Sequence, residues 1–317
     1  MPTTRAVRLH AFGDAAQGVR VEDLPIPEPG RGAVLVRMQR AVIHPADLNV
    51  IEGSYGRLPA LPAIIGNEGV GEVVAGDALP AGLRVRPLGG CWSEWVCVEA
   101  ARCLPIPGDL PLEQAAQLSV NPATAWAVLH EYRALLEPGS WVLVNAPASA
   151  LARSLTALCH ARGLRVAGLV RDPAEAPHLD RALLSERDSA RPLRELGARL
   201  ALNLLGGDSA ALLARGLAED GVLVTVGALA RAPLALPNGP LIFGELRCHG
   251  FWLSRWYGRA PRDLVQRMLG ELADLVRAGQ LRLPVAAVYP LDAIHAALAH
   301  AARRGRGGKV LLDLTAS

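Results

Sequence analysis

Lysine is almost absent from this chain of 317 residues: Lys309 is the single lysine among 33 basic residues, and arginine supplies the others. Basic and acidic residues nearly balance, 33 against 30, and long runs of like charge are lacking. Nucleic-acid-binding proteins usually carry a basic patch or stripe. The short cluster RRGR at 303–306 is better explained as a solvated helix end. We therefore expect no nucleic-acid partner.

Long apolar runs and paired cysteines are lacking too. No stretch approaches the length of continuous apolar sequence that spans a bilayer, and the N-terminal MPTTRAVRLHAFGD has no apolar core of a secretory signal. The five cysteines are an odd number in a chain long enough to bury its own core, which favours reduced thiols. With 51% hydrophobic and 20% charged residues, the composition is globular. We expect a cytoplasmic protein that engages no membrane.

The pattern of apolar runs changes near residue 112. Before it, β-rich runs such as 33–38 and 69–74 alternate with Pro- and Gly-rich clusters, which is typical of an irregular β domain. After it, helical patterns alternate with apolar runs at 141–145, 165–170, 200–204, 221–226 and 246–250, which predicts βαβ units and a parallel sheet. Helices over 264–277 and 291–303 and a strand over 309–314 complete the chain. The length favours two domains.

The segment from 141 to 171 carries the first functional signal. A strand (WVLVN), a turn, a helical stretch and a second strand (RVAGLV) follow within about 30 residues, the arrangement that places a pyrophosphate at a helix N-terminus. Arg171 ends the second strand, where a basic residue suits the 2′-phosphate of NADPH, whereas Asp172 after it keeps NADH open. The turn NAPASALAR contains no glycine, so its methyl groups would weaken cofactor binding or mark a domain that has lost its cofactor.

Four further segments resemble the 2-enoyl thioester reductase branch of the zinc-free quinone oxidoreductases, in the medium-chain dehydrogenase/reductase superfamily. They are IHPADLN (43–49), EGSYGRLPALPAIIGNE (52–68), SVNPATA (119–125) and LIFGELRCHGFWLSRW (241–256), and they follow the family's order along the chain. The resemblance implies an α/β fold. A Rossmann-type, doubly wound parallel sheet domain would span 119–261, and a β-rich, GroES-like catalytic domain would combine 1–118 with 262–317. It also implies a homodimer joined through the strand at 246–250.

The resemblance implies roles for individual residues as well. Tyr55, in GSYG, matches the family's proton donor and is the candidate acid. The implied cofactor-binding positions are Asn121, Thr124, Arg171, Phe243, Phe251, Trp252 and Lys309, and the turn before the helix adds Ser149, Ala150, Leu151 and Ala152. The candidate substrate-pocket residues are Asn67, Trp252 and Trp256. The chain departs from the family at His44, where the family usually has asparagine, and at Ala152, where the family's turn keeps a glycine.

The chemistry of enoyl reduction explains why such residues would be needed. Hydride reaches the β-carbon, negative charge develops on the thioester oxygen, and the α-carbon is then protonated. Tyr55 could supply that proton, although a surface turn tyrosine fits the local sequence equally well. His44, a second candidate catalytic residue, could form an acid relay with Asp47 or be a hydrogen-bonded pocket histidine beside a turn-capping aspartate. The aromatic residues of the last segment could line an acyl pocket or fill the core.

Zinc chemistry is disfavoured by the residues at the positions where the superfamily's alcohol dehydrogenases bind the metal. His44 and Asn67, followed by Glu68, stand there, and the asparagine is a poor zinc ligand. The cysteines at 91, 97 and 103 do not form the close pairs of a structural zinc site. We expect no metal.

The sequence thus predicts a zinc-independent reductase that takes hydride from NADPH. Its substrate would be a 2-enoyl thioester, either a small molecule on coenzyme A or a carrier-bound acyl group. One alternative is the reduction of a quinone or a simple enone. An alternative of another class is a non-redox protein that keeps this fold with weakened or lost nucleotide binding.

Overall fold

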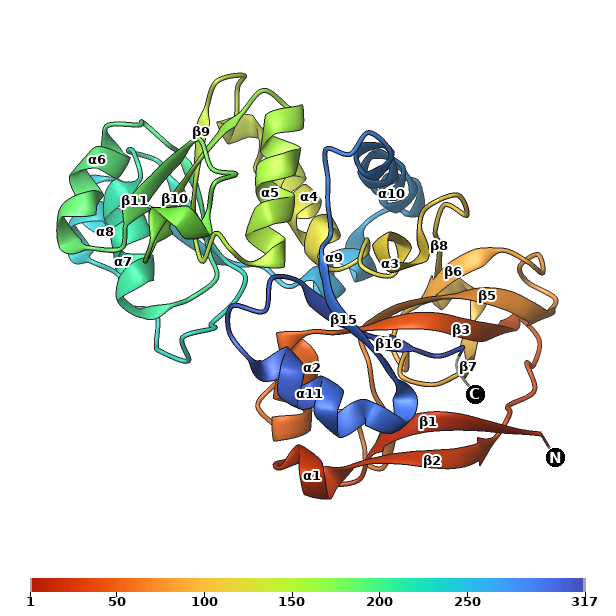
Figure 1. Cartoon of the computed structure of the whole chain (residues 1–317). Coiled ribbons are helices and arrows are strands. Elements are labelled where there is room, and N and C mark those ends of the chain that lie inside the picture. The colour runs from red at the N-terminus through yellow and green to blue at the C-terminus, as the bar shows by residue number, and fades with distance from the viewer. Residues whose placement is uncertain (1, 316–317) are drawn as a thin grey trace. The chain divides into compact units, whose positions relative to one another are not determined.

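A computed structural model describes residues 2–315 of the chain, which divides into two compact units (Figure 1). Unit 1 consists of Met1–Val120 and Gln266–Ser317, and unit 2 of Asn121–Val265. Each unit has its own sheet and its own apolar core.

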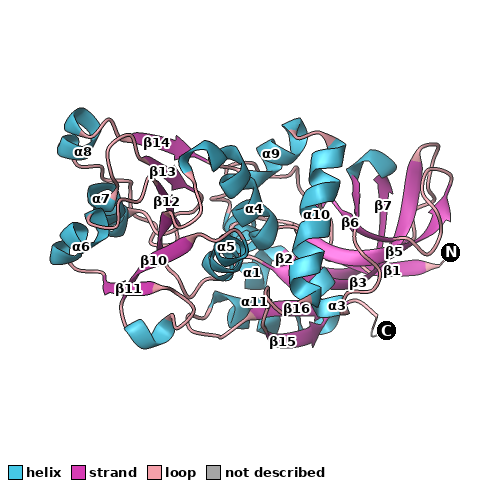
Figure 2. Ribbon diagram, turned by 90° about the horizontal axis from the view of Figure 1, so that it is seen from above, coloured by secondary structure: helices cyan, strands magenta, loops and turns pink. Residues whose placement is uncertain are grey.

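Unit 2 is a parallel sheet with helices on both faces (Figure 2). The strand order is β11 (Arg181–Leu184), β10 (Arg165–Val170), β9 (Trp141–Asn145), β12 (Leu200–Asn203), β13 (Val222–Thr225) and β14 (Arg247–Gly250), and all neighbours run parallel. On one face lie α4 (Asn121–Glu131) and α5 (Ala150–Ala161), and on the other α6 (Ala190–Arg194), α7 (Gly207–Gly216) and α8 (Asn238–Phe243). The helix α9 (Leu253–Arg259) follows β14. This arrangement confirms the predicted doubly wound α/β fold.

The inner strands of unit 2, β9, β10, β12 and β13, form where apolar side chains can fill both faces of the sheet. β9 and β10 have the bounds that the sequence predicts, and β12, β13 and β14 are shorter than predicted by one or two residues. The edge strand β11 escapes the sequence analysis. Its side chains are only partly buried or exposed, so they do not form the continuous apolar run that marks a buried parallel strand.

Unit 1 is built on two β-sheets. The larger has the order β15 (Val285–Pro290), β16 (Lys309–Asp313), β3 (Ala33–Ile43), β5 (Glu68–Gly76), β6 (Arg84–Pro87) and β8 (Cys103–Pro105), with β7 (Trp95–Glu99) also paired to β3. The smaller has the order β2 (Val19–Pro25), β1 (Thr3–Leu9) and β4 (Ala63–Ile64). The helices are α1 (Ala15–Gly18), α2 (Pro45–Glu52), α3 (Leu112–Ala115), α11 (Ile294–Ala302) and most of α10 (Arg262–Arg277). The returning strand that the sequence predicts is β16.

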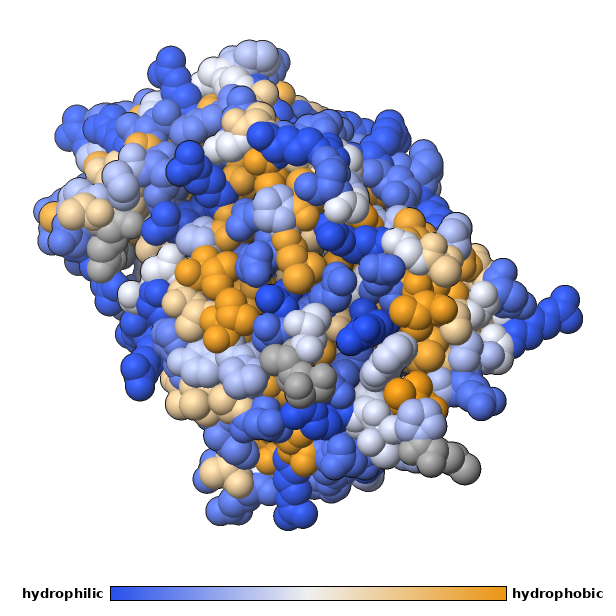
Figure 3. Space-filling view, turned by 45° about the vertical axis from the view of Figure 1, so that its right-hand side comes forward, coloured by the Kyte–Doolittle hydropathy of each residue, from blue (hydrophilic) through white to orange (hydrophobic). Residues whose placement is uncertain are grey.

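The surface of the molecule mixes apolar and polar side chains. On the face shown in Figure 3, apolar groups form several patches separated by hydrophilic ones. The most exposed large apolar side chains belong to α8, where Phe243 is 83% and Ile242 65% exposed. Within residues 2–315, no helix has both the length and the apolarity that a membrane crossing requires.

Candidate active site

Three polar residues of unit 1 meet where strands of its larger sheet begin and end. His44 directly follows the last residue of β3, Glu68 is the first residue of β5, and Lys309 is the first residue of β16. The antiparallel register sets Val42 of β3 opposite Glu68, and Ile43 opposite Val310. This pairing brings together residues that lie 24 and 265 positions apart in the sequence.

The imidazole of His44 links the other two side chains. Lys309 Nζ lies 3.0 Å from His44 Nδ1, and His44 Nε2 lies 2.7 Å from Glu68 Oε2. Burial, followed by the charge of Lys309, lowers the pKa of His44 to about 4, so the ring is neutral near pH 7. A neutral ring that accepts from the ammonium at Nδ1 carries its proton on Nε2 and donates it to Glu68. The two neighbours therefore fix the tautomer.

Lys309 and Glu68 are buried as charged groups, with only 5% and 0% of their surfaces exposed. Burial, with a contribution from the charge of Arg306, lowers the pKa of Lys309 to about 8. Burial opposes ionisation of Glu68, but its partners outweigh burial and leave its pKa below the ordinary value. Because His44 is neutral, we attribute this lowering to hydrogen bonds from His44 and Ser119 and to the charge of Arg86. Glu68 Oε1 accepts from the Ser119 amide at 2.7 Å and hydroxyl at 2.8 Å.

The hypothesis of an acid relay between His44 and Asp47 is wrong, because the imidazole is bonded to Glu68 instead. Asp47 Oδ2 accepts from the main-chain N–H of His44 at 2.7 Å, which caps the first turn of α2. Its Oδ1 accepts from the main-chain and side-chain N–H groups of Asn67, at 3.0 and 2.8 Å. Burial raises the pKa of Asp47 to about 7, while these N–H donors oppose the rise. Asp47 is therefore the capping residue of the plainer interpretation.

Asn67 is held on both sides. Its side-chain N–H donates to Asp47, and its main-chain carbonyl oxygen accepts from the guanidinium of Arg86 at 2.6 Å. Its role in a substrate pocket stays a prediction.

Tyr55 lies just beyond the other end of α2. The helix ends at Gly53, which has a left-handed φ of 81°, and the amide of Tyr55 donates to Asn49 O at 3.2 Å. The ring is partly buried against the core of unit 1. An eight-residue helix is about 12 Å long, so the two candidate catalytic residues, Tyr55 and His44, stand at opposite ends of α2 and do not form one hydrogen-bonded pair.

The turn between β9 and α5 in unit 2 joins a buried strand to a helix, as in dinucleotide-binding folds, and contains no glycine. Ala146 takes the left-handed conformation, with φ of 50°, that such turns usually leave to glycine. Ser149 caps α5, its Oγ accepting from the Ala152 amide at 3.2 Å. Ala152 is fully buried, so its methyl group packs inside unit 2, whereas Ala150 and Leu151 are partly exposed in the first turn. The methyl group of Ala152 therefore does not narrow the open side of the turn. The sequence-based expectation that this methyl group would hinder cofactor binding is not supported.

Buried amides tie the carboxyl ends of three neighbouring strands together below this turn. Asn145, at the end of β9, donates to Asn203 Oδ1 at 2.8 Å and accepts from the Leu204 amide at 2.6 Å. Asn203, at the end of β12, donates to Thr225 Oγ1 of β13 at 3.2 Å. Ligands of open parallel sheets bind at this edge, and the amide chain makes it rigid.

Arg171 and Asp172 follow the end of β10, as the sequence predicts. Arg171 is exposed. Asp172 Oδ1 accepts from the Ala174 amide at 2.9 Å and caps a short 3-10 turn. The carboxylate that would favour NADH is thus partly used within the chain.

The remaining predicted residues of unit 2 are spread over several elements. Asn121 begins α4, and Thr124 is buried within it. Phe251 follows β14, Trp252 is 38% exposed at the start of α9, and Phe243 is exposed at the end of α8. Their cofactor contacts stay predictions.

The prediction that Trp256 lines an acyl pocket is wrong. Its ring is 1% exposed and packs edge to face against Trp126, with centroids 6.2 Å apart. Its Nε1–H donates to Glu131 Oε1 at 2.9 Å. Trp256 therefore fills the core of unit 2 and fastens α9 to α4.

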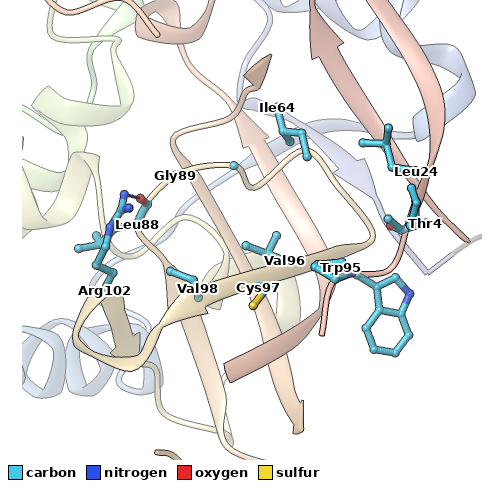
Figure 4. A pocket seen from close by; sticks show the side chains of 13 residues that line it. Thr4, Leu24, Ile64, Leu88, Gly89, Trp95, Val96, Cys97, Val98 and Arg102 are labelled. Carbon is cyan, nitrogen blue, oxygen red and sulfur yellow. Dashed lines mark hydrogen bonds between the residues drawn. The ribbon is translucent and has the colours of Figure 1, made fainter. Parts of the chain in front are cut away.

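A separate groove of about 500 Å³ lies in unit 1 beside β7 (Figure 4). Most of its lining is apolar, including Leu24, Val96 and Val98, and Arg102 stands at one end with its guanidinium donating to Leu88 O at 2.7 Å. The residues that line it include none of the predicted site residues. The lining offers neither an acid for protonation nor a helix N-terminus for a nucleotide. We therefore treat the His44 cluster of unit 1 and the β9–α5 turn of unit 2 as two candidate sites, each within its own unit.

Comparison with known proteins assigns the chain to a family. Residues 30–108 match the family model of the alcohol dehydrogenase GroES-like domain, and residues 179–312 that of the zinc-binding dehydrogenase. The mitochondrial enoyl-[acyl-carrier-protein] reductase of Homo sapiens is 35% identical over 93% of this chain and 84% of the relative. The Xenopus tropicalis relative of the same name is 32% identical over 93% and 91%. This chain belongs to the enoyl-[acyl-carrier-protein] reductase family.

Solved structures of the medium-chain dehydrogenase/reductase superfamily share the fold. A Bacillus thuringiensis protein assigned as an NADPH:quinone reductase superposes with a TM-score of 0.90, at 28% identity and over 99% of each chain. A mutant enoyl thioester reductase from Candida tropicalis superposes with a TM-score of 0.85, at 22% identity, over 99% and 100%. These likenesses confirm the predicted α/β fold with its GroES-like domain.

The zinc named in one of the family models does not fit this enoyl reductase family member. Both ring nitrogens of His44 are engaged, one of them by the ammonium of Lys309, and the side chain of Asn67 is bonded to Asp47. A metal ligand needs a free lone pair, and a neighbouring ammonium repels a second cation. Within residues 2–315, no three His, Cys, Asp or Glu side chains form a group that could hold a metal.

Two members of the buried cluster, Glu68 and Ser119, are not among the residues predicted from the sequence. Glu68 is noted above only as the neighbour of a position that binds zinc in alcohol dehydrogenases. A signal was present, because the acid stands directly before the apolar run of β5, and a carboxylate that is buried there is stable only with partners. The identity of those partners depends on the register of β3, β5 and β16, which the local sequence does not encode.

Proposed function

We propose that the protein reduces the carbon–carbon double bond of a 2-enoyl thioester with hydride from NADPH. The observation that carries the proposal is the β9–α5 turn, which keeps an anion-binding helix N-terminus in a member of the enoyl reductase family. The capped first turn of α5 offers N–H groups to a pyrophosphate, and Arg171 offers a cation to the 2′-phosphate. The residues present therefore fit the dinucleotide.

Bound NADPH would supply the hydride that adds to the β-carbon. The chain must then stabilise the negative charge on the thioester oxygen and protonate the α-carbon. Tyr55 is the group that we assign to the protonation, because its ring is only partly buried and follows the left-handed turn that ends α2. The transferred hydride and this proton together saturate the double bond.

His44 acts through Lys309 rather than on the substrate. The neutral imidazole has 3% of its surface exposed and uses both nitrogens within the cluster. It holds the Lys309 ammonium by a hydrogen bond, and Glu68 holds the imidazole. This arrangement orients the lysine that the family resemblance places near the cofactor.

Titration of the purified protein with NADPH and, separately, with NADH tests the proposal, with nicotinamide fluorescence as the readout. Saturable binding that prefers NADPH, followed by NADPH oxidation with a crotonyl thioester, is the expected result. Absence of binding by either dinucleotide would overturn the proposal and favour the non-redox alternative.

Quinone reduction is the second candidate. It is favoured by the 28% identity and full-length superposition with the Bacillus thuringiensis NADPH:quinone reductase. Parallel assays with a crotonyl thioester and a quinone, at matched NADPH, separate the two. The larger kcat/KM assigns the physiological class, since specificity is a ratio of these constants.

We further propose a homodimer joined through β14. This strand forms one edge of the six-stranded sheet, and an edge strand exposes main-chain groups that can pair with another strand. The exposed Ile242 and Phe243 of α8 precede it closely in the sequence and would be covered by a partner. Analytical ultracentrifugation should give twice the chain mass of 33.4 kDa, and a monomer at micromolar concentration would contradict the proposal.

A further inference from the structure

Arg153 occupies the first turn of the helix that the proposed function assigns to the dinucleotide. It is the fourth residue of the twelve-residue α5. Side chains of a helix point toward its N-terminus, so that of Arg153 is directed back over the turn. Its Nε donates to the carbonyl oxygen of Ala148 at 3.2 Å, which keeps the guanidinium beside the turn.

The guanidinium has spare donors at this place. In the part of the chain that the structure describes, Arg153 forms no ion pair, and Nε is the guanidinium nitrogen with a bonded partner. An arginine fork can give two parallel N–H bonds to a phosphate, which a lysine ammonium cannot match. The terminal nitrogens of Arg153 are therefore available to an anion at the mouth of the turn.

The positive charge of Arg153 affects a neighbouring histidine, His178. Its Nε2 donates to Pro147 O at 3.1 Å, on the turn itself. Burial, followed by the charge of Arg153, lowers the pKa of His178. The histidine thus supports the turn as a neutral ring, and the positive charge at the turn comes from Arg153 and from the N-terminus of α5.

We propose that Arg153 binds the pyrophosphate of the dinucleotide and replaces the close backbone approach that a glycine-rich turn provides. The inference rests on the proposed function and adds a binding residue to it. The side chains of Ala150 and Leu151 are partly exposed in the first turn of α5, so the backbone cannot approach a phosphate there as closely as in a glycine-rich turn. A long side chain with a bidentate fork reaches across that extra space.

Arg153 and Arg171 would then bind different phosphate groups of the dinucleotide. Arg153 stands at the start of α5, where the pyrophosphate lies in this fold, and Arg171 follows β10, where the adenosine ribose lies. The pyrophosphate is common to NADPH and NADH, whereas the 2′-phosphate belongs to NADPH alone. Loss of Arg153 should weaken both ligands equally, and loss of Arg171 should weaken NADPH selectively.

The experiment measures Kd for NADPH and NADH in the wild type, Arg153→Gln, Arg153→Lys and Arg171→Gln. Arg215→Gln, at an exposed position of α7, is the control for loss of one positive charge in unit 2. Arg153→Gln should raise both Kd values by the same factor, about tenfold or more, as expected for a charged hydrogen bond. Arg153→Lys should recover part of the loss, and the dependence of log Kd on log salt should become shallower in Arg153→Gln. Melting temperatures check that each variant folds.

The possible outcomes distinguish a failure of the role proposed for Arg153 from a failure of the proposed function. Kd values for Arg153→Gln within twofold of Arg215→Gln, with wild-type binding intact, would overturn the pyrophosphate role and leave the proposed function standing. A loss confined to NADPH would overturn it as well, because the arginine would then read the 2′-phosphate. A wild type that binds neither dinucleotide would overturn the proposed function and this inference together.

Discussion

The buried ammonium of Lys309 should lower the stability of unit 1 at neutral pH. Its pKa falls from 10.5 to about 8 in the folded protein, chiefly through burial. Between these two pH values the unfolded chain binds more protons at this group than the folded chain does, so the free energy of unfolding rises with pH across that window. One pKa unit corresponds to about 1.4 kcal/mol, which makes the full rise about 3 kcal/mol.

The variant Lys309→Met removes the ammonium, because methionine has a similar length and no charge. It also removes the donor to His44 Nδ1, which costs about 1–3 kcal/mol for a buried acceptor left unpaired. Near pH 7 the two effects oppose each other, and the variant should be about as stable as the wild type. Near pH 10.5 only the lost hydrogen bond remains, so the variant should be the less stable protein.

Urea unfolding at several pH values from 7 to 10.5, followed by tryptophan fluorescence, measures the difference between the two proteins. The comparison must be a difference, because burial raises the pKa of Cys91 to about 12 and that thiol lowers stability as the pH rises above 9. This effect is the same in both proteins and cancels. A difference in unfolding free energy that stays constant from pH 7 to 10.5 would contradict this prediction and show that Lys309 keeps its ordinary pKa.

Three further substitutions test other parts of the site. His44→Asn should remove a loss of stability that the wild type suffers as the pH falls from 6.5 toward 4, because the folded chain resists protonation of the buried ring; acid unfolding curves of the two proteins measure it. Ala146→Gly should stabilise unit 2 by about 1 kcal/mol by relieving the left-handed alanine, and an unchanged urea midpoint would contradict this. Tyr55→Phe should lower kcat for a crotonyl thioester by about a hundredfold without changing the Kd of NADPH, whereas an unchanged kcat would exclude the tyrosine as the acid.

The sequence predicts the parallel sheet of unit 2 better than the β-sheets of unit 1. β9 and β10 are buried on both faces, so each appears as a continuous apolar run with clear ends. β3 is predicted to end at 38 and extends to Ile43. Gln39 and Arg40 interrupt its apolar pattern, yet pairing with β5 and β16 carries the strand past them. Tertiary pairing overrides local preference there.

The candidate site is harder to read from the sequence because its contacts are long-range. His44 and Lys309 are each recognisable from family segments, but the bond between them depends on the pairing of β3 with β16. Trp256 shows the opposite difficulty. A run of aromatic residues suits a pocket and a core equally, and only the packing against Trp126 decides for the core.

The burial of position 309 explains why a lysine stands there in a chain whose other basic residues are arginines. Of the 33 basic residues, the single lysine stands where a cation is almost wholly buried and close to Arg306. An arginine there would stay charged at every attainable pH and would need several hydrogen-bond acceptors for its guanidinium. An ammonium is smaller, needs fewer partners, and can give up its proton near pH 8, which the neutral His44 beside it tolerates. Lysine therefore suits this position better than arginine, because its ammonium needs fewer acceptors and one of them is His44 Nδ1.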